Sequence, residues 1–280
     1  MTTQTEPSNS SDRTGGQSAD LAAGEALTRM RAAAPLVHCI TNYVAMNIAA
    51  NVVLAAGASP AMVHAEEEAA DFTAMVGALT VNIGTTSGPW HRAMVQAARA
   101  ARSGGTPWIL DPVAHFITPF RRNAAAELMA LSPTIVRGNA SEILALAGAE
   151  TAGKGADAGD AVEHAAEPAR ALATQTGSVV VVTGVTDIVT DGARMARISG
   201  GHALMPKVTA LGCALTALTG AYAAVETDPF GATVAACAHF AAAGARAGAD
   251  AAGPGSFQVA FLDALADVGP ADLDAWVASA

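Results

Sequence analysis

The sequence predicts an α/β fold, a three-layer sandwich in which a mostly parallel central sheet is flanked by helices. Short apolar runs rich in β-branched residues alternate with longer Ala-rich segments, the pattern of parallel strands joined by crossover helices. The chain has 280 residues, 51% of them hydrophobic, so it can bury a large core. We expect residues 21–280 to form a single domain.

The predicted strands are the short apolar runs. Six of them follow one another along the chain, at residues 36–40, 61–63, 79–83, 108–110, 134–137 and 179–183. The segment 188–198 has Asp191-Gly192 at its centre, a dipeptide that favours a tight hairpin turn. We therefore expect a β-hairpin there that closes one edge of the sheet.

The predicted helices are the Ala-rich segments. They cover residues 46–56, 66–76, 89–103, 123–131, 141–147, 168–176, 212–225, 229–249 and 255–266. The helix at 66–76 begins with Glu66-Glu67-Glu68, and acidic side chains in a first turn complement the helix dipole. We expect residues 153–159 to form a loop. Residues 1–20 are rich in Ser, Thr, Gly and Gln without an apolar signal region, which predicts a disordered leader.

Charge and cysteine content exclude several classes of protein. The formal net charge of −10 argues against general nucleic-acid binding, which depends on Lys and Arg neutralising phosphates. The three cysteines, Cys39, Cys213 and Cys237, form no C-x-x-C pair. This favours a reducing compartment, so we expect a cytoplasmic protein without structural zinc. The longest apolar stretches are Ala-rich, and Ala drives membrane insertion poorly, so we expect no membrane partner.

Polar residues follow most of the predicted strands. Each could be turn chemistry, because Asn, Asp, Gly and Thr also end strands for local backbone reasons. In open α/β sheets, however, ligands bind beyond the carboxyl ends of the strands, and a succession of such ends favours one shared site. The candidates are Thr41-Asn42, Asn82, Gly84-Thr85-Thr86, Asp111-Pro112, Arg137-Gly138-Asn139 and Thr183-Gly184.

A cysteine stands at the start of the predicted helix that follows Thr209-Ala210-Leu211. The first turn of a helix offers unpaired N–H groups and the positive end of the peptide dipoles, which suit phosphate and favour thiolate over thiol. Alone, Cys213 is more often a small buried packing residue. Together with Asp111, Arg137 and Thr183 it supplies the parts that phosphoryl transfer needs, because carboxylates suit Mg²⁺ and an Arg suits nucleotide phosphates.

Ordered segments of the sequence, among them Val37-His38-Cys39-Ile40-Thr41-Asn42-Tyr43-Val44 and Leu110-Asp111-Pro112-Val113, closely resemble the hydroxyethylthiazole kinase family, whose members are ribokinase-like enzymes. The P-loop, Rossmann, zincin and nucleophile-elbow motifs are absent, which removes the competing motif-based assignments. The resemblance covers nearly the whole chain past the leader. It is carried by Val37-His38-Cys39-Ile40-Thr41-Asn42-Tyr43-Val44, Leu110-Asp111-Pro112-Val113, Arg137-Gly138-Asn139-Ala140-Ser141-Glu142, and by residues 57–62, 64–68, 82–85, 182–184, 190–192, 201–202, 207–209, 212–213 and 253–257.

The resemblance implies a ribokinase-like sandwich and ATP-dependent, Mg²⁺-assisted phosphorylation of the thiazole alcohol 4-methyl-5-(2-hydroxyethyl)thiazole, a step toward thiamine. It also implies a homotrimer with active sites between subunits. It assigns each site residue a role: Asn42, Val44, Met62 and Ala210 to the thiazole, Arg137, Thr183 and Asn139 to ATP, Asp111 and Glu142 to the metal, and Cys213 to catalysis. Related sugar kinases have a general-base Asp at the Cys213 position, and a helix N-terminus could lower the pKa of a thiol there.

At two places the sequence departs from the family pattern in ways that could change how substrate or nucleotide fits. Residues 114–118 replace a Gly-rich stretch with Ala, His, Phe, Ile and Thr, which exchanges flexible backbone for bulk. Ala210 stands where the family usually has Gly, so an amide-lined anion site requires Ala210 to adopt the necessary backbone angles. A Met in an apolar strand is more often a core residue than a ligand contact, so only the family resemblance assigns Met62 to the thiazole.

Alternative functions stay open at this point. One is a ribokinase-like kinase for a hydroxymethylpyrimidine or pyridoxal type of vitamin precursor, or a nucleotide-repair dehydratase. Those groups tend to carry Asp at the position of Cys213. The other is a non-catalytic ligand-binding relative, for which we would expect loss of Asp111, Glu142 or Gly212; all three are present.

Overall fold

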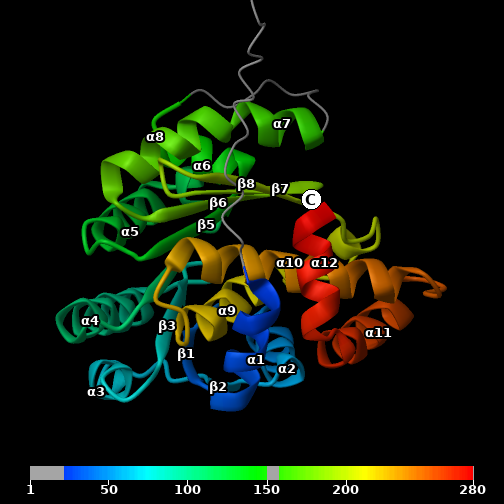
Figure 1. Ribbon diagram of the computed structural model, residues 1–280. Helices are drawn as coiled ribbons and strands as arrows, with labels where there is room; N and C mark the ends of the chain where they lie inside the picture. The colour runs from blue at the N-terminus through cyan, green and yellow to red at the C-terminus, as the bar shows by residue number, and fades with distance from the viewer. Residues whose placement is uncertain (1–21, 150–157, 280) are drawn as a thin grey trace, which may run out of the picture.

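A single sheet of eight strands organises the computed structural model, which describes residues 22–149 and 158–279 (Figure 1). The strands lie in the order β2-β1-β3-β4-β5-β6-β7-β8; those from β2 to β6 are parallel, and β7 and β8 are antiparallel additions at one edge. Their bounds are β1 (Leu36–Ile40), β2 (Ser59–Ala61), β3 (Ala78–Asn82), β4 (Trp108–Asp111), β5 (Ile135–Asn139), β6 (Val179–Thr183), β7 (Thr186–Thr190) and β8 (Met195–Ser199).

Helices cover both faces of this sheet, so the predicted three-layer sandwich is confirmed (Figure 1). One face carries α1 (Ala23–Ala33), α2 (Met46–Ala56), α9 (Leu211–Ala223), α10 (Pro229–Gly248), α11 (Pro254–Asp267) and α12 (Pro270–Ser279). The other carries α3 (Ala69–Thr73), α4 (Gly88–Gly104), α5 (Pro119–Met129), α6 (Ala140–Leu146), α7 (Ala158–His164) and α8 (Ala166–Thr176). Two short 3₁₀ helices, η1 (His115–Ile117) and η2 (Met205–Lys207), complete the set.

Strand β6 shows how the sequence pattern builds two cores. Val179 and Val181 pack into the cluster beneath α9 and α10, whereas Val180 and Val182 pack into the cluster beneath α6 and α8. Successive side chains of a strand point to opposite faces, so an unbroken Val run is stable only where both faces are buried. Helix α9 is buried between the sheet and α10, α2 and α1.

The register of the parallel strands aligns the polar residues at their ends. Asn82 of β3 pairs with Asp111 of β4, and Asn139 of β5 pairs with Thr183 of β6. Cα partners in adjacent strands place these side chains at one edge of the sheet, as the sequence predicts for a shared site.

The predicted elements differ from the structure mainly at their bounds. Strand β2 lies two residues before its predicted place, and α3 is shorter than the predicted helix at 66–76. Helix α5 begins at Pro119, before the predicted start, because the Thr118 hydroxyl accepts the Arg121 N–H and caps the helix. Three α-helices of the described residues were not predicted, α1, α7 and α12, and neither were the 3₁₀ helices η1 and η2. The predicted hairpin at 188–198 is confirmed by β7 and β8.

Two predictions fall partly or wholly outside the described residues. The leader at residues 1–20 is one, and most of the loop at 153–159 is the other; residues 158 and 159 already belong to α7. Within the described residues, helices long and apolar enough to cross a membrane are absent.

Candidate active site

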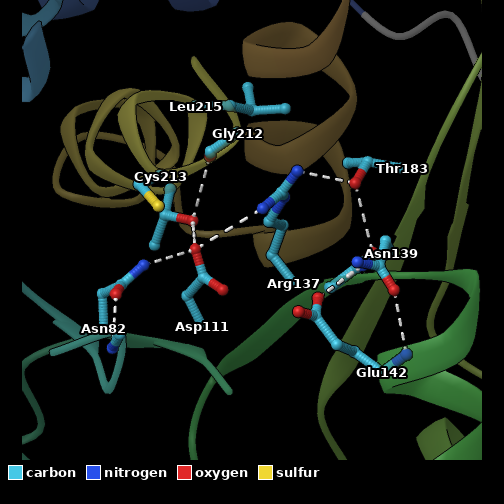
Figure 2. Close-up of polar contacts among 12 residues, drawn as sticks. Asn82, Asp111, Arg137, Asn139, Glu142, Thr183, Gly212, Cys213 and Leu215 are labelled. Carbon is cyan, nitrogen blue, oxygen red and sulfur yellow. Dashed lines mark hydrogen bonds and ion pairs between the residues drawn. The ribbon is translucent and has the colours of Figure 1, made fainter. Parts of the chain in front are cut away.

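The predicted site residues from β4, β5 and β6 converge beneath the start of α9 (Figure 2). Figure 2 shows Asp111 and Arg137 side by side, with Thr183 beyond the arginine and Cys213 above the aspartate. Three strands and one helix therefore supply a single polar centre, which the sequence could propose only as a list of separate strand ends.

Asp111 is the buried acid of this centre, with no exposed surface. Its Oδ2 accepts hydrogen bonds from Asn82 Nδ2 and Thr216 Oγ1, both at 2.8 Å, and Arg137 Nη1 lies 3.5 Å away. Its Oδ1 has no partner among the described residues. Burial raises the pKa of Asp111 to about 6, with the Arg137 charge opposing that shift and Glu142 adding to it. One buried carboxylate oxygen is thus left for a ligand.

Arg137 lies over the first turn of α9. Its Nη2 donates to Thr183 Oγ1 at 2.6 Å, and its buried Nε has no partner among the described residues. A β-carbon added at Gly212 would come within 2.6 Å of Arg137 Nη2, so only glycine allows this approach. A guanidinium next to the positive end of a helix is favourable when an anion lies between them, so this arrangement suits phosphate.

The backbone before α9 takes the form that an anion site needs. Ala210 has φ 61° and ψ 16°, in the left-handed region, and caps the helix from there. The alanine therefore adopts the conformation that the usual glycine would, at a strain of roughly 1–2 kcal/mol. The first-turn N–H groups of Leu211, Gly212 and Cys213 have no partners within the helix and can face a ligand.

The Cys213 thiol is half-buried and accepts a hydrogen bond from Asn42 Nδ2 at 3.4 Å. Burial, followed by the charge of Asp111, raises its pKa, and the opposing effects of Arg137, Asn42 and Asn82 are smaller. The expectation that the helix N-terminus lowers the pKa of Cys213 is therefore wrong. Desolvation and the neighbouring Asp111 carboxylate raise the pKa of the thiol, so Cys213 is protonated at neutral pH.

Glu142 and Asn139 form a capping box at the start of α6. Asn139 Oδ1 accepts the Glu142 N–H at 3.0 Å, and Glu142 Oε2 accepts the Asn139 N–H at 2.8 Å. Glu142 Oε1 accepts the Ala114 N–H at 2.8 Å. Both carboxylate oxygens are thus already engaged by backbone amides, which leaves their second lone pairs for water or a ligand.

Among the predicted thiazole-side residues, Asn42 is joined directly to the centre. Its Oδ1 accepts the N–H groups of Val44 and Ala45, both at 3.0 Å, and its Nδ2 donates to Asn82 Oδ1 and to Cys213. All four hydrogen-bonding positions of this amide are occupied. The apolar side chains lie outside this network: Val44 is 56% exposed, and Met62 is partly buried against the main core cluster.

Sequence reasoning missed two residues that build the centre. Thr216 is one of two threonines on the mostly apolar α9, and it lies three positions after Cys213, so it shares the same helix face. That spacing was the available signal. Arg121 donates to the carbonyl oxygens of Ile83, Gly84 and Val113 and so joins the loops that follow β3 and β4.

The side-chain oxygens of this centre determine whether it could bind a magnesium ion. Groups of three or more His, Cys, Asp or Glu side chains that could enclose a metal are absent from the described residues. Mg²⁺ bound with nucleotide phosphates usually takes only one or two protein carboxylates and keeps several waters. The unpartnered, buried Oδ1 of Asp111 fits that role, whereas Glu142 fits best through water.

Comparison with known proteins identifies a single family. The model of the "Hydroxyethylthiazole kinase family" matches residues 27–270. The chain is 63% identical over 253 residues to a hydroxyethylthiazole kinase of Rhizobium johnstonii, covering 90% of this chain and 95% of the relative. It is 62% identical over 254 residues to the hydroxyethylthiazole kinase of Roseobacter denitrificans, covering 90% of this chain and 98% of the relative.

Solved structures agree with the sequence comparisons. The hydroxyethylthiazole kinase of Pyrococcus horikoshii OT3 superposes with a TM-score of 0.82 at 40% identity, over 88% of this chain and 93% of that one. A Bacillus subtilis pyridoxal kinase solved with ADP gives a TM-score of 0.56 at 17% identity, over 74% of this chain and 90% of that one, a likeness that concerns the fold alone.

Proposed function

The chain belongs to the hydroxyethylthiazole kinase family, and on that premise we propose that it transfers the terminal phosphoryl group of ATP to the hydroxyl of 4-methyl-5-(2-hydroxyethyl)thiazole. It has the ribokinase-like fold of this family. The product is the thiazole phosphate of thiamine biosynthesis and salvage.

The observation that carries this function is the pairing of Arg137 with the start of α9 beside the free Oδ1 of Asp111. Arg137 and Thr183 bind the nucleotide phosphates from the β5–β6 side, with Asn139 beside them. The first-turn amides of α9 surround the phosphoryl group as it moves. Phosphoryl transfer has a loose transition state, so alignment and charge neutralisation supply most of the acceleration.

Asp111 Oδ1 would hold Mg²⁺ directly, and Glu142 would hold it through water. When bound, the ion neutralises charge on the phosphates and on the leaving group. Because Asn82 and Thr216 occupy Oδ2, the carboxylate of Asp111 can present only its other oxygen. Burial that raises the pKa of Asp111 also makes a neighbouring cation favourable.

The acceptor occupies the Cys213 side of the centre, where Asn42, Val44, Met62 and Ala210 define the thiazole pocket. Cys213 Sγ would lie next to the acceptor hydroxyl, and only its thiolate form could take the hydroxyl proton late in the transfer; from the protonated thiol form the proton leaves to water. Because burial raises the pKa of Cys213, only a small fraction of the sulfur is thiolate at neutral pH. Positioning of the hydroxyl is therefore the larger part of what this side chain contributes.

We propose a homotrimer with the active sites between subunits. A partly exposed aromatic cluster borders the acceptor side: Tyr43 is 65% exposed, the centre of its ring lies 4.4 Å from that of Trp90, and the half-buried His64 ring lies 4.5 Å from the same half-buried Trp90. A second subunit would bury these rings. Three free cysteines, two of them buried, support a cytoplasmic location. We also propose residues 21–280 as a single kinase domain.

The direct test incubates the purified protein with Mg²⁺-ATP and hydroxyethylthiazole, hydroxymethylpyrimidine or pyridoxal, each separately. ADP formation and the mass of the phosphorylated product are followed together. We expect turnover with the thiazole. Turnover with another acceptor only would mean that the altered 114–118 segment changes which acceptor the enzyme prefers. If no acceptor is phosphorylated, a non-catalytic ligand-binding relative is favoured.

A further inference from the structure

The side-chain amides of Asn42 and Asn82 form a connected pair beneath the centre, and both are nearly fully buried. Asn42 Nδ2 donates to Asn82 Oδ1 at 2.8 Å. Asn82 lies at the end of β3, and Asn42 follows the end of β1, the adjacent strand in the sheet. The pair therefore spans two strand ends, with Cys213 near one member and Asp111 near the other.

Backbone donors determine which way each amide points. Asn82 Oδ1 accepts the Gly84 N–H at 2.9 Å, and Asn42 Oδ1 accepts the N–H groups of Val44 and Ala45. A backbone N–H can only donate, so these contacts identify the oxygen end of each amide. Both NH₂ ends consequently face the centre. Asn82 donates to Asp111 Oδ2, and Asn42 donates to Cys213 Sγ.

The surrounding loops hold this arrangement in place. A β-carbon added at Gly84 would lie 2.7 Å from the side chain of Asn42, so the turn after β3 packs directly against the amide. Arg121 donates to the carbonyl oxygens of Ile83 and Gly84 in the same turn and to that of Val113 after β4. The amide pair is thus supported from outside the centre by a cation that ties the two neighbouring loops together.

We propose that Asn82 is a positioning residue for the proposed phosphoryl transfer, because its one amide orients both the metal-side carboxylate of Asp111 and, through Asn42, the acceptor-side sulfur of Cys213. This inference rests on the proposed function. Asn82 occupies Asp111 Oδ2 and so leaves Oδ1 to the ligand. Through its oxygen it holds Asn42, whose NH₂ makes Cys213 Sγ an acceptor and turns the thiol hydrogen away from the amide.

Asn82→Ser and Asn82→Asp test the proposal with two readouts. Both variants remove the NH₂ donor, and the aspartate keeps the size of the side chain. The first readout is kcat and KM for ATP and the thiazole. The second is the rate at which N-ethylmaleimide alkylates Cys213 at about pH 8, where a change in donation to the sulfur changes thiol reactivity. Cys39 and Cys237 are buried, so the reaction reports on Cys213.

Two control variants separate positioning from general damage. Thr216→Val also removes a donor to Asp111 Oδ2 and preserves shape, but within the described part of the chain the Thr216 hydroxyl makes no hydrogen bond to Asn42 or Asn82. Asn51→Asp makes the same chemical change on α2, where Asn51 Nδ2 donates to Asn47 Oδ1 in a solvent-exposed hydrogen bond. Thermal unfolding of all four variants measures any loss of structure.

We expect both Asn82 variants to lower kcat by about tenfold or more, with a smaller change in KM for ATP, because the reacting groups lose alignment. We also expect them to slow alkylation of Cys213 by about threefold or more. The serine loosens the amide that donates to the sulfur, and the aspartate adds a negative charge that disfavours the thiolate. Thr216→Val should lower kcat and leave alkylation near the wild-type rate, and Asn51→Asp should change neither.

Wild-type kcat in both Asn82 variants, or wild-type alkylation in both, would overturn the proposal. If one Asn82 variant unfolds, the other decides. Alkylation requires no acceptor or nucleotide, so it tests the link from Asn82 to Cys213 even in a protein that does not phosphorylate the thiazole. A failure of the proposed function is therefore distinguished from a failure of this inference.

Discussion

Gly212 lies directly against the guanidinium of Arg137, so closely that a β-carbon at Gly212 would come within 2.6 Å of Nη2. This contact brings a side-chain cation from β5 to the first turn of α9. Neither residue alone makes an anion site, but together they form the site that we propose for a phosphate.

Gly212→Ala should displace Arg137 and raise KM for ATP, lowering kcat/KM by about tenfold to a hundredfold, because displacements near 1 Å have such effects in active sites. Stability should change little, since alanine is a good helix residue. Steady-state kinetics check this. The matched control is Gly255→Ala on α11, where an added β-carbon meets nothing within 4 Å. Equal kinetics for both variants would contradict the assigned role of Gly212.

Ala210→Gly should stabilise the protein, because it relieves a left-handed backbone at φ 61° that costs an alanine roughly 1 kcal/mol or more. The loop keeps its shape, so kinase activity should persist. Denaturant unfolding measures the gain. Ala126→Gly in α5 should instead cost about 1 kcal/mol, since glycine is unfavourable inside an exposed helix. A loss of stability in Ala210→Gly would show that the alanine conformation is not strained.

Removal of Mg²⁺ and Asp111→Asn should each abolish most of the turnover. The amide of the variant would be neutral and could not balance a divalent ion, so we expect a loss of about a hundredfold or more in kcat. A titration of the variant with Mg²⁺ at saturating ATP should show weaker dependence on the metal. Asp263→Asn, at an exposed position of α11, is the matched control. Full activity in the presence of EDTA would exclude the assigned metal.

The raised pKa of Cys213 predicts how activity depends on pH. If the sulfur accepts the hydroxyl proton, kcat of the wild type should increase with pH on the alkaline side, as the thiolate fraction grows. Cys213→Asp should retain or raise turnover and remove this increase, whereas Cys213→Ser should lower turnover. The measurement is kcat of all three proteins as a function of pH. Equal turnover in all three proteins would leave Cys213 with a purely spatial role.

Buried His239 should make the protein less stable in acid. Its Nε2–H donates to Leu265 O, and its Nδ1 accepts from the Tyr222 hydroxyl, so the ring is neutral. Burial lowers its pKa from 6.5 to about 4. A depressed pKa in a base contributes stability above pH 6.5 that is lost as the pH falls toward 4. Between about pH 7.5 and about pH 5, the titration of His239 should lower the free energy of unfolding by about 2 kcal/mol.

Two carboxyls act in the opposite direction over the same range. The pKa values of Asp111 and Asp187 are raised to about 6, so their contribution is present below pH 3.8 and is lost as the pH rises through 6. The difference between wild type and His239→Gln isolates the histidine. Unfolding free energies measured at both pH values should show a smaller acid loss in the variant. Parallel curves would mean that His239 does not titrate as stated.

Two of the helices that sequence reasoning missed, α1 and α12, pack against each other although they are far apart in the chain. Gly24 N–H of α1 donates to Asp274 Oδ1 of α12 at 2.7 Å, across almost the entire chain. A β-carbon at Gly24 would come within 2.4 Å of Pro270 O, so the two helices pack at backbone contact. Local composition does not encode such a pairing, because each helix is stabilised mainly by burial against the other.

By itself, the sequence predicted that the polar strand ends form one shared site, and its resemblance to a family predicted phosphoryl transfer to a thiazole alcohol. Alternation of Val-rich and Ala-rich segments encodes the sheet and its helices, and short polar segments at strand ends follow from local backbone rules. Only the tertiary structure decided which atoms are free: Oδ1 rather than Oδ2 of Asp111, a protonated Cys213, and an amide of Asn42 already fully occupied. Hydrogen-bond partners and desolvation come from residues far apart in the chain, and these two effects set the charge and orientation of every group in the site.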